Sequence, residues 1–272
     1  MKTITLRIPY ESRSDVFKIV PFGDIHAGTV FCREDKVRAK AKEIKNDPFT
    51  YWVGMGDMGE FITPKDKRFD AQVLSDGDWL KKNDIAASQE EWVYELFSPI
   101  KDKCLGLIMG NHEVSIQRDN NHDIFGHLIS RLGVKDLGYS CFYRLLFERL
   151  NSTVTTVTFH IEHGSGGAQT EGGKAMRLYK SMCGFEADIY LMGHLHDVKI
   201  LPISYLSMTL NGEIKEKSKI GCITGCWYAT YTDADSPSYA EQKGYSPTNM
   251  GCPVIEITPD KREMQAVHKK IF

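Results

Sequence analysis

Phe17-Lys-Ile-Val-Pro-Phe-Gly-Asp-Ile-His26 is the stretch of sequence that decides the fold. Its first six residues form a short apolar run of the kind that builds a buried strand. The run ends in a glycine, which lets the backbone turn sharply, and two residues that commonly bind metal ions follow at once. One Asp24-x-His26 pair is usually only a turn, so its meaning depends on whether the pattern recurs.

The pattern recurs at the ends of four further apolar runs, which we expect to be strands. These runs are Tyr51–Met55, Leu105–Met109, Val154–Ile161 and Ile189–Met192. The residues that close them are Gly56-Asp57, Gly110-Asn111-His112-Glu113, His163-Gly164 and Gly193-His194-x-His196. Ligands of open α/β sheets bind outside the carboxyl ends of the strands, so side chains from separate strand ends can converge there. Five such elements, each closing its own apolar run, predict one site.

Helical patterns separate these runs in the first two-thirds of the chain. Their apolar stripes are Val37, Ala41 and Ile44; Trp92, Val93, Leu96 and Phe97; Ile124, Phe125, Leu128, Ile129 and Leu132; and Ala175, Tyr179 and Met182. After Asp197 we expect strands with no helix between them, at Val198–Met208, Lys219–Thr224, Pro253–Ile257 and Met264–Ile271. Alternating strands and helices followed by strands alone predict an α/β fold in which two packed sheets have helices outside.

The bulk properties of the chain narrow its class. Its 272 residues contain no linker-like stretch, and we expect a single domain over residues 1–272. The formal net charge of −2 argues against a protein that coats nucleic acid over a large area. No apolar run approaches the roughly 18 residues of a membrane span, so no membrane partner is expected. The absence of an apolar signal segment and the scattered cysteines predict a cytoplasmic protein with reduced thiols.

The candidate ligands are two aspartates, one asparagine and several histidines, with no thiolate among them. Such a set of oxygen and nitrogen donors suits Mn²⁺, Fe or Zn²⁺ better than Cu(I) or an iron–sulfur cluster. The lone Cys222-x₃-Cys226 pair has no second pair of cysteines, so it does not predict a separate zinc site. We therefore expect divalent metal ions held by carboxylate, amide and imidazole groups.

The ordered set of motifs from Asp24 to His196 resembles that of the calcineurin-like metallophosphoesterase superfamily, and it spans about two-thirds of the chain. The resemblance implies a four-layer α/β/β/α sandwich of two mixed sheets flanked by helices, with the β-rich remainder of the chain in the second sheet. It also implies a dinuclear site on one edge of the sandwich. The two divalent ions expected there are Mn first, with Fe, Zn or Ni as alternatives.

The resemblance further implies a role for each candidate residue. Asp24, His26 and His196 would hold the first metal, Asn111, His163 and His194 the second, and Asp57 would bridge both. His112 would protonate the leaving oxygen or stabilise the transition state. Two cations ~3.5–4 Å apart can hold a bridging hydroxide and clamp the phosphate oxygens during an in-line displacement. The implied activity is hydrolysis of a phosphoric ester.

Three features leave alternatives open. His160 could rival His163 as a ligand, and we prefer His163 because a glycine follows it where the strand should end. His122 could reach the site or belong to a polar cluster where a helix begins. The glycine-rich segment 164–174, which ends in Lys174, could offer N–H groups and a charge to a phosphate, or form a rim without phosphate contact.

The substrate class is inferred from one departure from the family's pattern. Protein Ser/Thr phosphatases of the superfamily carry an arginine after this motif, and that arginine grips a phosphomonoester dianion. Here the stretch reads Gly56-Asp57-Met58-Gly59-Glu60-Phe61, with no arginine. The sequence therefore looks more like the nuclease and phosphodiesterase branch, because a diester carries one charge fewer. We expect a phosphodiesterase that acts on DNA, RNA or a nucleotide diester.

Two regions are candidates for the walls of the substrate pocket. The polar insertion Phe61–Leu80 carries Lys65, Lys67 and Arg68. The segments 227–231 and 238–243 place aromatic residues beside a basic one, which either stack on bases or pack a loop onto the sheet. Two other functions stay open: a phosphomonoesterase of nucleotides or small phosphates, and a non-catalytic binding protein that keeps the fold.

Overall fold

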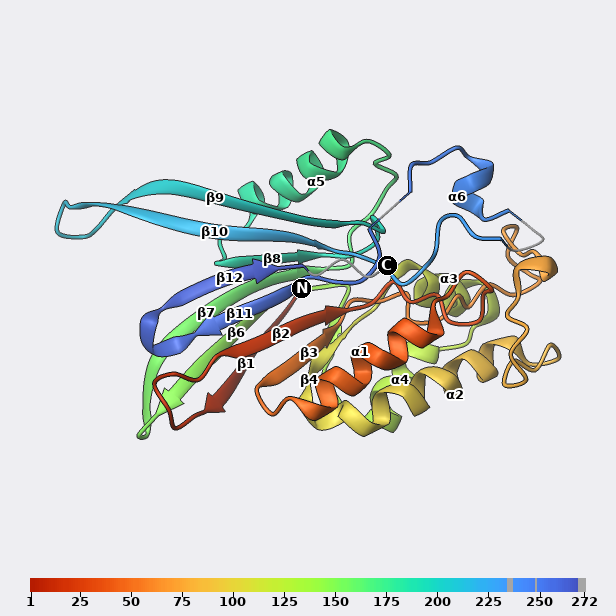
Figure 1. Cartoon of the computed structure of the whole chain (residues 1–272), viewed down its shortest axis with the longest axis horizontal. Helices are drawn as coiled ribbons and strands as arrows, with labels where there is room; N and C mark the ends of the chain where they lie inside the picture. Colours follow the sequence, from red (N-terminus) through yellow and green to blue (C-terminus); the bar gives the residue numbers. More distant parts are fainter. Residues whose placement is uncertain (234–236, 248, 269–272) are drawn as a thin grey trace.

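Two six-stranded sheets pack face to face and carry helices on their outer faces (Figure 1). The structure is a computed structural model, which describes residues 1–233, 237–247 and 249–268. One apolar cluster fills the space between the sheets, and a separate cluster lies between each sheet and its helices. The α/β fold with two mixed sheets flanked by helices, predicted from the sequence, is thus confirmed.

The first sheet has the order β12-β11-β2-β3-β4-β5. Its strands are β2 (Phe17–Phe22), β3 (Thr50–Gly54), β4 (Cys104–Ile108), β5 (Asp136–Gly138), β11 (Val254–Thr258) and β12 (Glu263–Val267). The strands from β2 to β5 run parallel, whereas β11 pairs antiparallel with both β2 and β12. The carboxyl ends of β2, β3 and β4 therefore lie side by side.

The second sheet has the order β1-β6-β7-β8-β10-β9. Its strands are β1 (Lys2–Pro9), β6 (Ser140–Arg149), β7 (Ser152–Glu162), β8 (Ile189–Met192), β9 (Val198–Met208) and β10 (Ile214–Thr224). Strand β8 runs parallel to both of its neighbours, β7 and β10. The carboxyl ends of β7 and β8 thus meet at one edge, as those of β2, β3 and β4 do in the other sheet.

The helices are α1 (Glu34–Asn46), α2 (Ile85–Phe97), α3 (Asn111–Asn120), α4 (Ile124–Leu132), α5 (Glu171–Gly184) and α6 (Tyr239–Gln242), with 3₁₀ turns at Ala71–Val73, Ser98–Lys103 and Pro259–Lys261. Helices α1, α2 and α4 cover the first sheet, and α5 covers the second (Figure 1). The acidic residues Glu34 and Asp35 in the first turn of α1 favour its start by interacting with the helix dipole. No helix in the described part of the chain is both long and apolar enough to cross a membrane.

The second half of the chain departs from the prediction in how its strands are shared. We expected the β-rich remainder to form the second sheet, but β9 and β10 extend that sheet while β11 and β12 join the first. The reason is pairing over long sequence distances, as between Ile255 and Ile19, which local patterns do not encode. The short helix α6 also interrupts a stretch in which no helix was expected. The strand predicted at 264–271 is β12, and residues 269–272 lie outside the described part.

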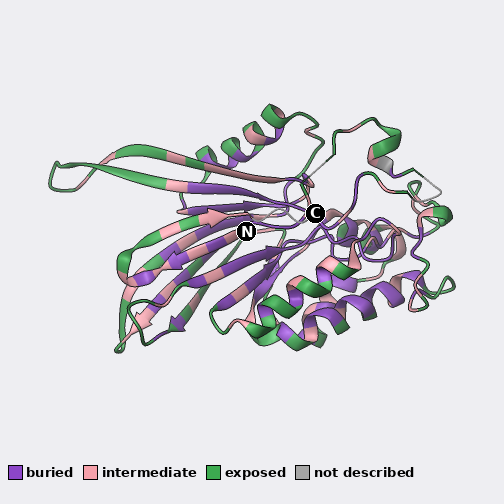
Figure 2. Ribbon diagram, in the orientation of Figure 1, coloured by how far each residue is buried: buried purple, intermediate pink, exposed green. Residues whose placement is uncertain are grey.

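One predicted stripe was partly wrong. Tyr179, placed on the buried face of the helix before Gly184, is 45% exposed, and Leu178 packs against the sheet beside the predicted Met182. Elsewhere burial follows the layers: the inner strands are buried, whereas the far half of the β9–β10 hairpin projects into solvent (Figure 2).

Candidate metal centre

The predicted ligands meet where the carboxyl ends of five strands lie together. Asp24 follows β2, Asp57 follows β3, Asn111 begins α3 shortly after β4, His163 follows β7, and His194 follows β8. Main-chain bonds join these turns, because the N–H of Asp24 donates to the carbonyl of Gly56 (2.9 Å) and the N–H of Ile25 to that of Asp57 (2.9 Å). The two sheets thus present their polar strand ends to one volume.

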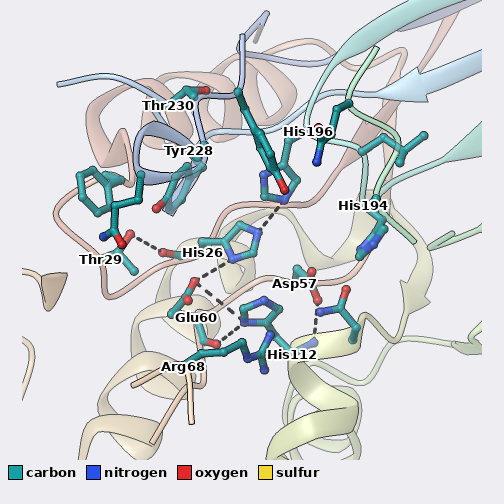
Figure 3. Close-up of a pocket in the computed structure, with 18 of the residues that line it drawn as sticks. His26, Thr29, Asp57, Glu60, Arg68, His112, His194, His196, Tyr228 and Thr230 are labelled. Atoms are coloured by element: carbon teal, nitrogen blue, oxygen red, sulfur yellow. Dashed lines mark hydrogen bonds and ion pairs between the residues drawn. The ribbon is translucent and has the colours of Figure 1, made fainter. Parts of the chain in front are cut away.

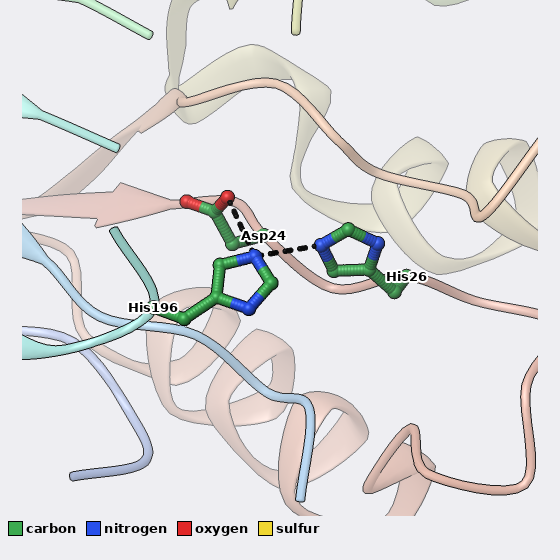
Figure 4. A group of neighbouring side chains, drawn as sticks. All are labelled: Asp24, His26 and His196. Carbon is green, nitrogen blue, oxygen red and sulfur yellow. Dashed lines mark hydrogen bonds and ion pairs between the residues drawn. The ribbon is translucent and has the colours of Figure 1, made fainter. Parts of the chain in front are cut away.

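A first group consists of Asp24, His26 and His196, whose ligand atoms all lie within 4.8 Å of one another (Figure 4). The Nε2 atoms of His26 and His196 are 3.0 Å apart. His196 Nε2 lies 3.5 Å from Asp24 Oδ1. These are the three residues that the family resemblance implied as ligands of the first metal.

A second group consists of Asp57, His163 and His194, again with ligand atoms within 4.8 Å of one another. His163 Nε2 lies 3.2 Å from Asp57 Oδ2 and 3.0 Å from Asn111 Oδ1. All seven residues predicted as ligands are therefore brought together. Asp57, expected to bridge both metals, lies with the second group, and the assignment of each residue to a metal stays a prediction.

The hydrogen bonds of the histidines aim lone pairs into this volume. The Nδ1 of His163 must donate to the carbonyl oxygen of Met55 (2.7 Å), because a carbonyl oxygen only accepts. Likewise His26 Nδ1 donates to the carboxylate of Glu60 (2.8 Å). When His26 or His163 is neutral, its Nε2 atom is therefore a hydrogen-bond acceptor. That atom faces other groups that can accept, namely the imidazole of His196 for His26 and the oxygens of Asp57 and Asn111 for His163. Converging acceptors with oriented imidazoles fit a divalent cation, since ligating histidines commonly donate their other N–H in this way.

The backbone at the centre is strained. Five of the seven residues, namely Asp24, His26, Asp57, His194 and His196, have φ between 47° and 68°, in the left-handed region. Non-glycine residues avoid this region, and each such conformation costs roughly 1–3 kcal/mol. Strain of this kind persists where the surrounding structure over-determines it, and it clusters at functional sites.

Two glycines permit the turns to approach one another. A Cβ atom on Gly56 would lie 2.6 Å from the backbone of Gly110 and 2.8 Å from the ring of His163. A Cβ on Gly110 would lie 2.2 Å from the carboxylate of Asp57. Any side chain at either position would push the strand ends apart, so these glycines set the spacing of the site.

Glu113 braces the Asp57 turn from the first turn of α3. Its carboxylate accepts hydrogen bonds from the N–H groups of Asp57 (3.0 Å), Met58 (2.9 Å) and Gly110 (2.9 Å). Burial and the nearby charge of Asp57 raise the pKa of Glu113 to about 7. The N–H of His112 also donates to Asp57 Oδ1 (2.9 Å), so the N-terminus of α3 supports the negative charge at this position.

The charges of the centre shift the pKa values of its members strongly. Burial acts to raise the pKa of Asp57, but the neighbouring His163 and His112 hold it well below its usual range. Burial acts to lower the pKa of His163, but the charge of Asp57 and the hydrogen bond that the protonated ring donates to its carboxylate raise that pKa to about 10. For His194, burial and the charge of His163 lower the pKa to about 4. The carboxylate thus attracts positive charge into the site.

His112 and Glu60 lie beside the first group (Figure 3). The Nδ1 of His112 donates to the main-chain carbonyl of Glu60, which leaves Nε2 as the free nitrogen of the ring. Burial acts to lower the pKa of His112, but the charges of Asp57 and Glu60 raise it. Sequence reasoning missed Glu60: it stands within the quoted motif, but only the fold shows that it orients His26.

The centre opens into a cavity of about 550 Å³ (Figure 3). Residues of the predicted loop 61–80 line one wall, among them Ile62, Arg68 and Val73. Of the aromatic residues suggested for the pocket, Tyr228 lines the cavity, whereas Trp227 is buried against Phe22 at 5.2 Å between ring centroids. Trp227 thus packs the loop onto the sheet, whereas for Tyr228 stacking on a base stays a prediction.

The glycine-rich segment 164–174 forms another wall, with Gly166, Gly167, Ala168 and Gln169 lining the cavity. Lys174 also lines it, but its ammonium group is buried and lies 3.0 Å from Asp197 Oδ2. The lysine is therefore largely neutralised by Asp197, which reduces the charge it can offer to a phosphate.

The remaining histidines lie outside the centre. His160 is buried, and its ring stacks on Phe185 with centroids 3.9 Å apart. His122 lies 4.0 Å from Glu90 and does not line the cavity. His268 approaches the carbonyl of Met250 at 3.3 Å. The structural alternative for His160 and the polar-cluster alternative for His122 are the ones that the geometry supports.

Comparisons with known proteins agree with this arrangement. The family of calcineurin-like phosphoesterases matches residues 17–198, which hold all eight predicted site residues. A search of curated proteins found no match to the chain. Among solved structures, Vps29 complexed with zinc from Entamoeba histolytica is similar with a TM-score of 0.38 and 8% identity, over 94% of this chain and 99% of that one. That likeness is too low to carry an argument. The family match covers more than half of the chain, and the chain therefore belongs to the calcineurin-like phosphoesterase family.

Proposed function

We propose that the protein is a metal-dependent phosphodiesterase that acts on nucleic acid or nucleotide diesters. The observation that carries the proposal is the convergence of imidazole lone pairs and carboxylate oxygens on two neighbouring positions. Asp24, His26 and His196 would hold one divalent ion, and Asn111, His163 and His194 the other, with Asp57 between them. Mn²⁺ is the first expectation, with Fe, Zn and Ni as alternatives.

The bound ions would supply Lewis-acid activation of water and of the phosphate. The protein's own residues supply orientation. Glu60 and the carbonyl of Met55 hold the rings of His26 and His163, so that neither ring must reorganise when substrate arrives. The N–H of His194 donates to the carboxylate of Asp24 (3.0 Å), which fixes that carboxylate at the edge of the first group.

His112 is the proposed proton donor. Its ring is held by the carbonyl of Glu60, and the negative charges of Asp57 and Glu60 favour its protonated form. A protonated ring carries a proton on Nε2 in addition to the one on Nδ1. We assign His112 to the transfer of the Nε2 proton to the leaving oxygen of the ester, a general-acid role that typically contributes 10²–10⁴-fold to the rate.

Preference for a diester is supported by the missing arginine in the motif that follows β3. One observation favours the monoesterase alternative: the guanidinium of Arg68, from the loop 61–80, reaches the cavity. That guanidinium is already paired with Asp66 at 2.7 Å, so it is less available to grip a dianion.

The seven free cysteines support the cytoplasmic location proposed with this function, because disulfides form in oxidising compartments.

Hydrolysis of two chromogenic esters by metal-stripped and Mn²⁺-loaded protein tests the proposal. Mn²⁺-dependent turnover of bis-(p-nitrophenyl) phosphate in preference to p-nitrophenyl phosphate, lost in Asp57→Asn, supports a phosphodiesterase. Preference for the monoester, reduced by Arg68→Ala, supports the alternative phosphatase. If two ions bind and neither ester is hydrolysed, the result favours a non-catalytic binding protein. If no metal binds, the proposal is wrong.

A further inference from the structure

One wall of the cavity contains the aromatic ring of Tyr228, which lies beside the first ligand group. The ring centroid of Tyr228 is 5.6 Å from that of His26 and 6.0 Å from that of His196. On its other side the ring contacts Phe31, which is buried, at 5.2 Å. An isolated bridge pairs the backbone of Tyr228 with Cys32, so the ring is held at a fixed place next to the centre (Figure 3).

The segment that follows Tyr228 continues this wall. Thr230, Pro237, Ala240 and Tyr245 line the cavity. Main-chain bonds tie the segment together, since the N–H of Tyr245 donates to the carbonyl of Ala240 at 2.9 Å. In Figure 1 the α6 segment and the loop before α2 lie at the same end of the molecule. The metal centre is thus approached between two loops rather than across an open face.

The loop opposite is also held in place. The N–H of Val30 donates to the carbonyl of Val73 (3.0 Å), and that of Ser75 to the carbonyl of Gly28 (2.9 Å). The cavity of about 550 Å³ that these walls enclose falls within the range of roughly 300–1,000 Å³ typical of small-molecule sites. A nucleic-acid duplex, whose major groove alone is ≈ 12 Å wide, is far larger than such a cavity.

The charges of the cavity point the same way. Apart from histidines, its basic lining residues are Arg68 and Lys174 among those described, and both are ion-paired, with Asp66 and Asp197. Proteins that bind a nucleic-acid backbone tightly neutralise many phosphates with lysine and arginine. Here positive charge for a single phosphate must come mainly from the metal centre, and the rest of the lining combines aromatic and aliphatic residues with uncharged polar ones such as Gln169 and Gln242.

We infer that the substrate is a small diester of a single nucleoside, with its base against Tyr228, rather than a nucleic-acid polymer. The inference rests on the proposed phosphodiesterase function and names the substrate class of the same site. The phosphate lies at the two ligand groups, and the planar base lies beside Tyr228. The ring centroid of Tyr228 is 5.6 Å from that of His26, so one small diester reaches both places. Stacking of a base on an aromatic side chain is tolerant of base identity, so the subsite selects a nucleoside rather than a sequence.

Two esters with the same leaving group isolate the contribution of the base. These are thymidine 5′-(p-nitrophenyl phosphate) and methyl p-nitrophenyl phosphate, compared by kcat/KM in Mn²⁺-loaded protein. We expect the nucleoside ester to be preferred at least about tenfold, and Tyr228→Ala to reduce that ratio by about tenfold. Tyr228→Phe keeps the ring and should keep the ratio. Tyr179→Ala, an exposed tyrosine on α5 outside the cavity, is the matched control.

A binding measurement gives a second readout. By calorimetry, the Kd of thymidine 5′-monophosphate should rise about tenfold in Tyr228→Ala and remain unchanged in Tyr179→Ala. A single-stranded oligodeoxynucleotide and its duplex complete the series, and both should be hydrolysed far more slowly than the nucleoside ester.

The outcomes separate the two proposals. Equal kcat/KM for the methyl and nucleoside esters, or a ratio that Tyr228→Ala leaves unchanged, overturns the subsite while leaving the phosphodiesterase standing. Faster hydrolysis of the oligonucleotide or the duplex overturns the small-substrate inference. No hydrolysis of either p-nitrophenyl ester with metal bound contradicts the phosphodiesterase itself, and the inference falls with it.

Discussion

Two regions of the molecule gather acidic and histidine side chains, and they hold them differently. At the metal centre, His26 and His163 are buried and each donates its Nδ1 proton to a fixed acceptor. On the outer helices, Glu90 of α2 meets His122 and His127, whose nitrogens lie 4.0 and 3.8 Å from its Oε2. We call this second set the α2–α4 cluster.

The α2–α4 cluster lacks the features that mark the centre. His127 has a side chain that is 60% exposed, and Arg131 lies 3.3 Å from Glu90 Oε1, so the carboxylate already has a cationic partner. At the centre, by contrast, lone pairs face carboxylates and an amide oxygen, and the backbone is strained to keep them there. Residue types within reach of one another are thus insufficient for a site, and burial with a fixed orientation of the rings makes the difference.

The largest expected effect follows from changing Asp57, the carboxylate of the second ligand group that we propose to lie between the two ions. Asp57→Asn keeps the shape of the side chain but removes the charge that draws cations in, so we expect phosphoesterase activity to fall by about 10³-fold or more. The matched change in the α2–α4 cluster, Glu90→Gln, should leave activity within twofold. Initial rates with bis-(p-nitrophenyl) phosphate at saturating Mn²⁺ measure both. Equal losses in the two variants would erase the distinction between the regions.

His112→Asn is expected to lower kcat by about 10²-fold, because it removes the proton donor without removing a ligand. Metal content, measured by inductively coupled plasma mass spectrometry, should be unchanged. The loss should be smaller for an ester whose leaving group needs no proton, such as p-nitrophenolate, than for one with an alkoxide leaving group. A uniform loss for both leaving groups would assign His112 to transition-state charge rather than proton transfer.

Glu60→Ala removes the acceptor that orients His26. We expect the affinity for the first metal to drop by about 10- to 100-fold, as for other residues that orient metal ligands. The ring of His112 should stay in place, since it binds the main-chain carbonyl of Glu60 rather than its side chain. Isothermal titration of metal-stripped protein gives the affinity, with Glu91→Ala on the surface of α2 as control. An unchanged affinity would show that Glu60 does not act through His26.

The affinity for metal should rise with pH, by up to about tenfold per unit for each proton displaced. In the metal-free protein the pKa of His163 is raised to about 10 by Asp57, so this ring is protonated at neutral pH and must release its proton when a cation binds. His194, with a pKa lowered to about 4, is already neutral above pH 5 and releases none. Calorimetry in two buffers of different ionisation enthalpy counts the protons. Metal binding without proton release between pH 6 and 8 would contradict this assignment.

The smallest effects are expected in the α2–α4 cluster. His122→Ala and His127→Ala should change the free energy of unfolding by no more than about 0.5 kcal/mol, as is usual for surface positions. Neither change should alter the number of metal ions bound. Urea unfolding with and without Zn²⁺ measures this, and zinc-dependent stabilisation lost in either variant would make the cluster a second metal site.

The sequence predicted the centre better than its surroundings. The five strand ends could be recognised because each joins a buried apolar run to ligand-type residues, which is a local pattern. Three strands were found with their bounds as predicted, Phe17–Phe22, Ile189–Met192 and Val198–Met208. The partition of strands between the sheets could not be predicted, because β11 joins β2 across more than 230 residues.

Glu60 shows which part of the cavity was harder to predict. Glu60 reaches His26 only because the turn after β3 passes through the left-handed region at Asp57 and Phe61. Arg68 and Tyr228, by contrast, belong to the two segments predicted as pocket walls, and both line the cavity. Their approach across 160 residues depends on tertiary packing, so which side chains of these segments would face the cavity could not be predicted. Strand β6 was not predicted, although its sequence has the alternation typical of a strand. The buried residues along it are Cys141, Tyr143, Leu145 and Phe147.

The count of metal ions per chain tests the central claim most directly. Metal-stripped protein is loaded with Mn²⁺, dialysed, and analysed by inductively coupled plasma mass spectrometry beside Asp57→Asn and Glu90→Gln. Two ions per chain in the wild type and in Glu90→Gln, with fewer than one in Asp57→Asn, is the result that the paired ligand groups predict. Absence of bound metal in the wild type, or the same count in all three proteins, would contradict a dinuclear centre at the strand ends.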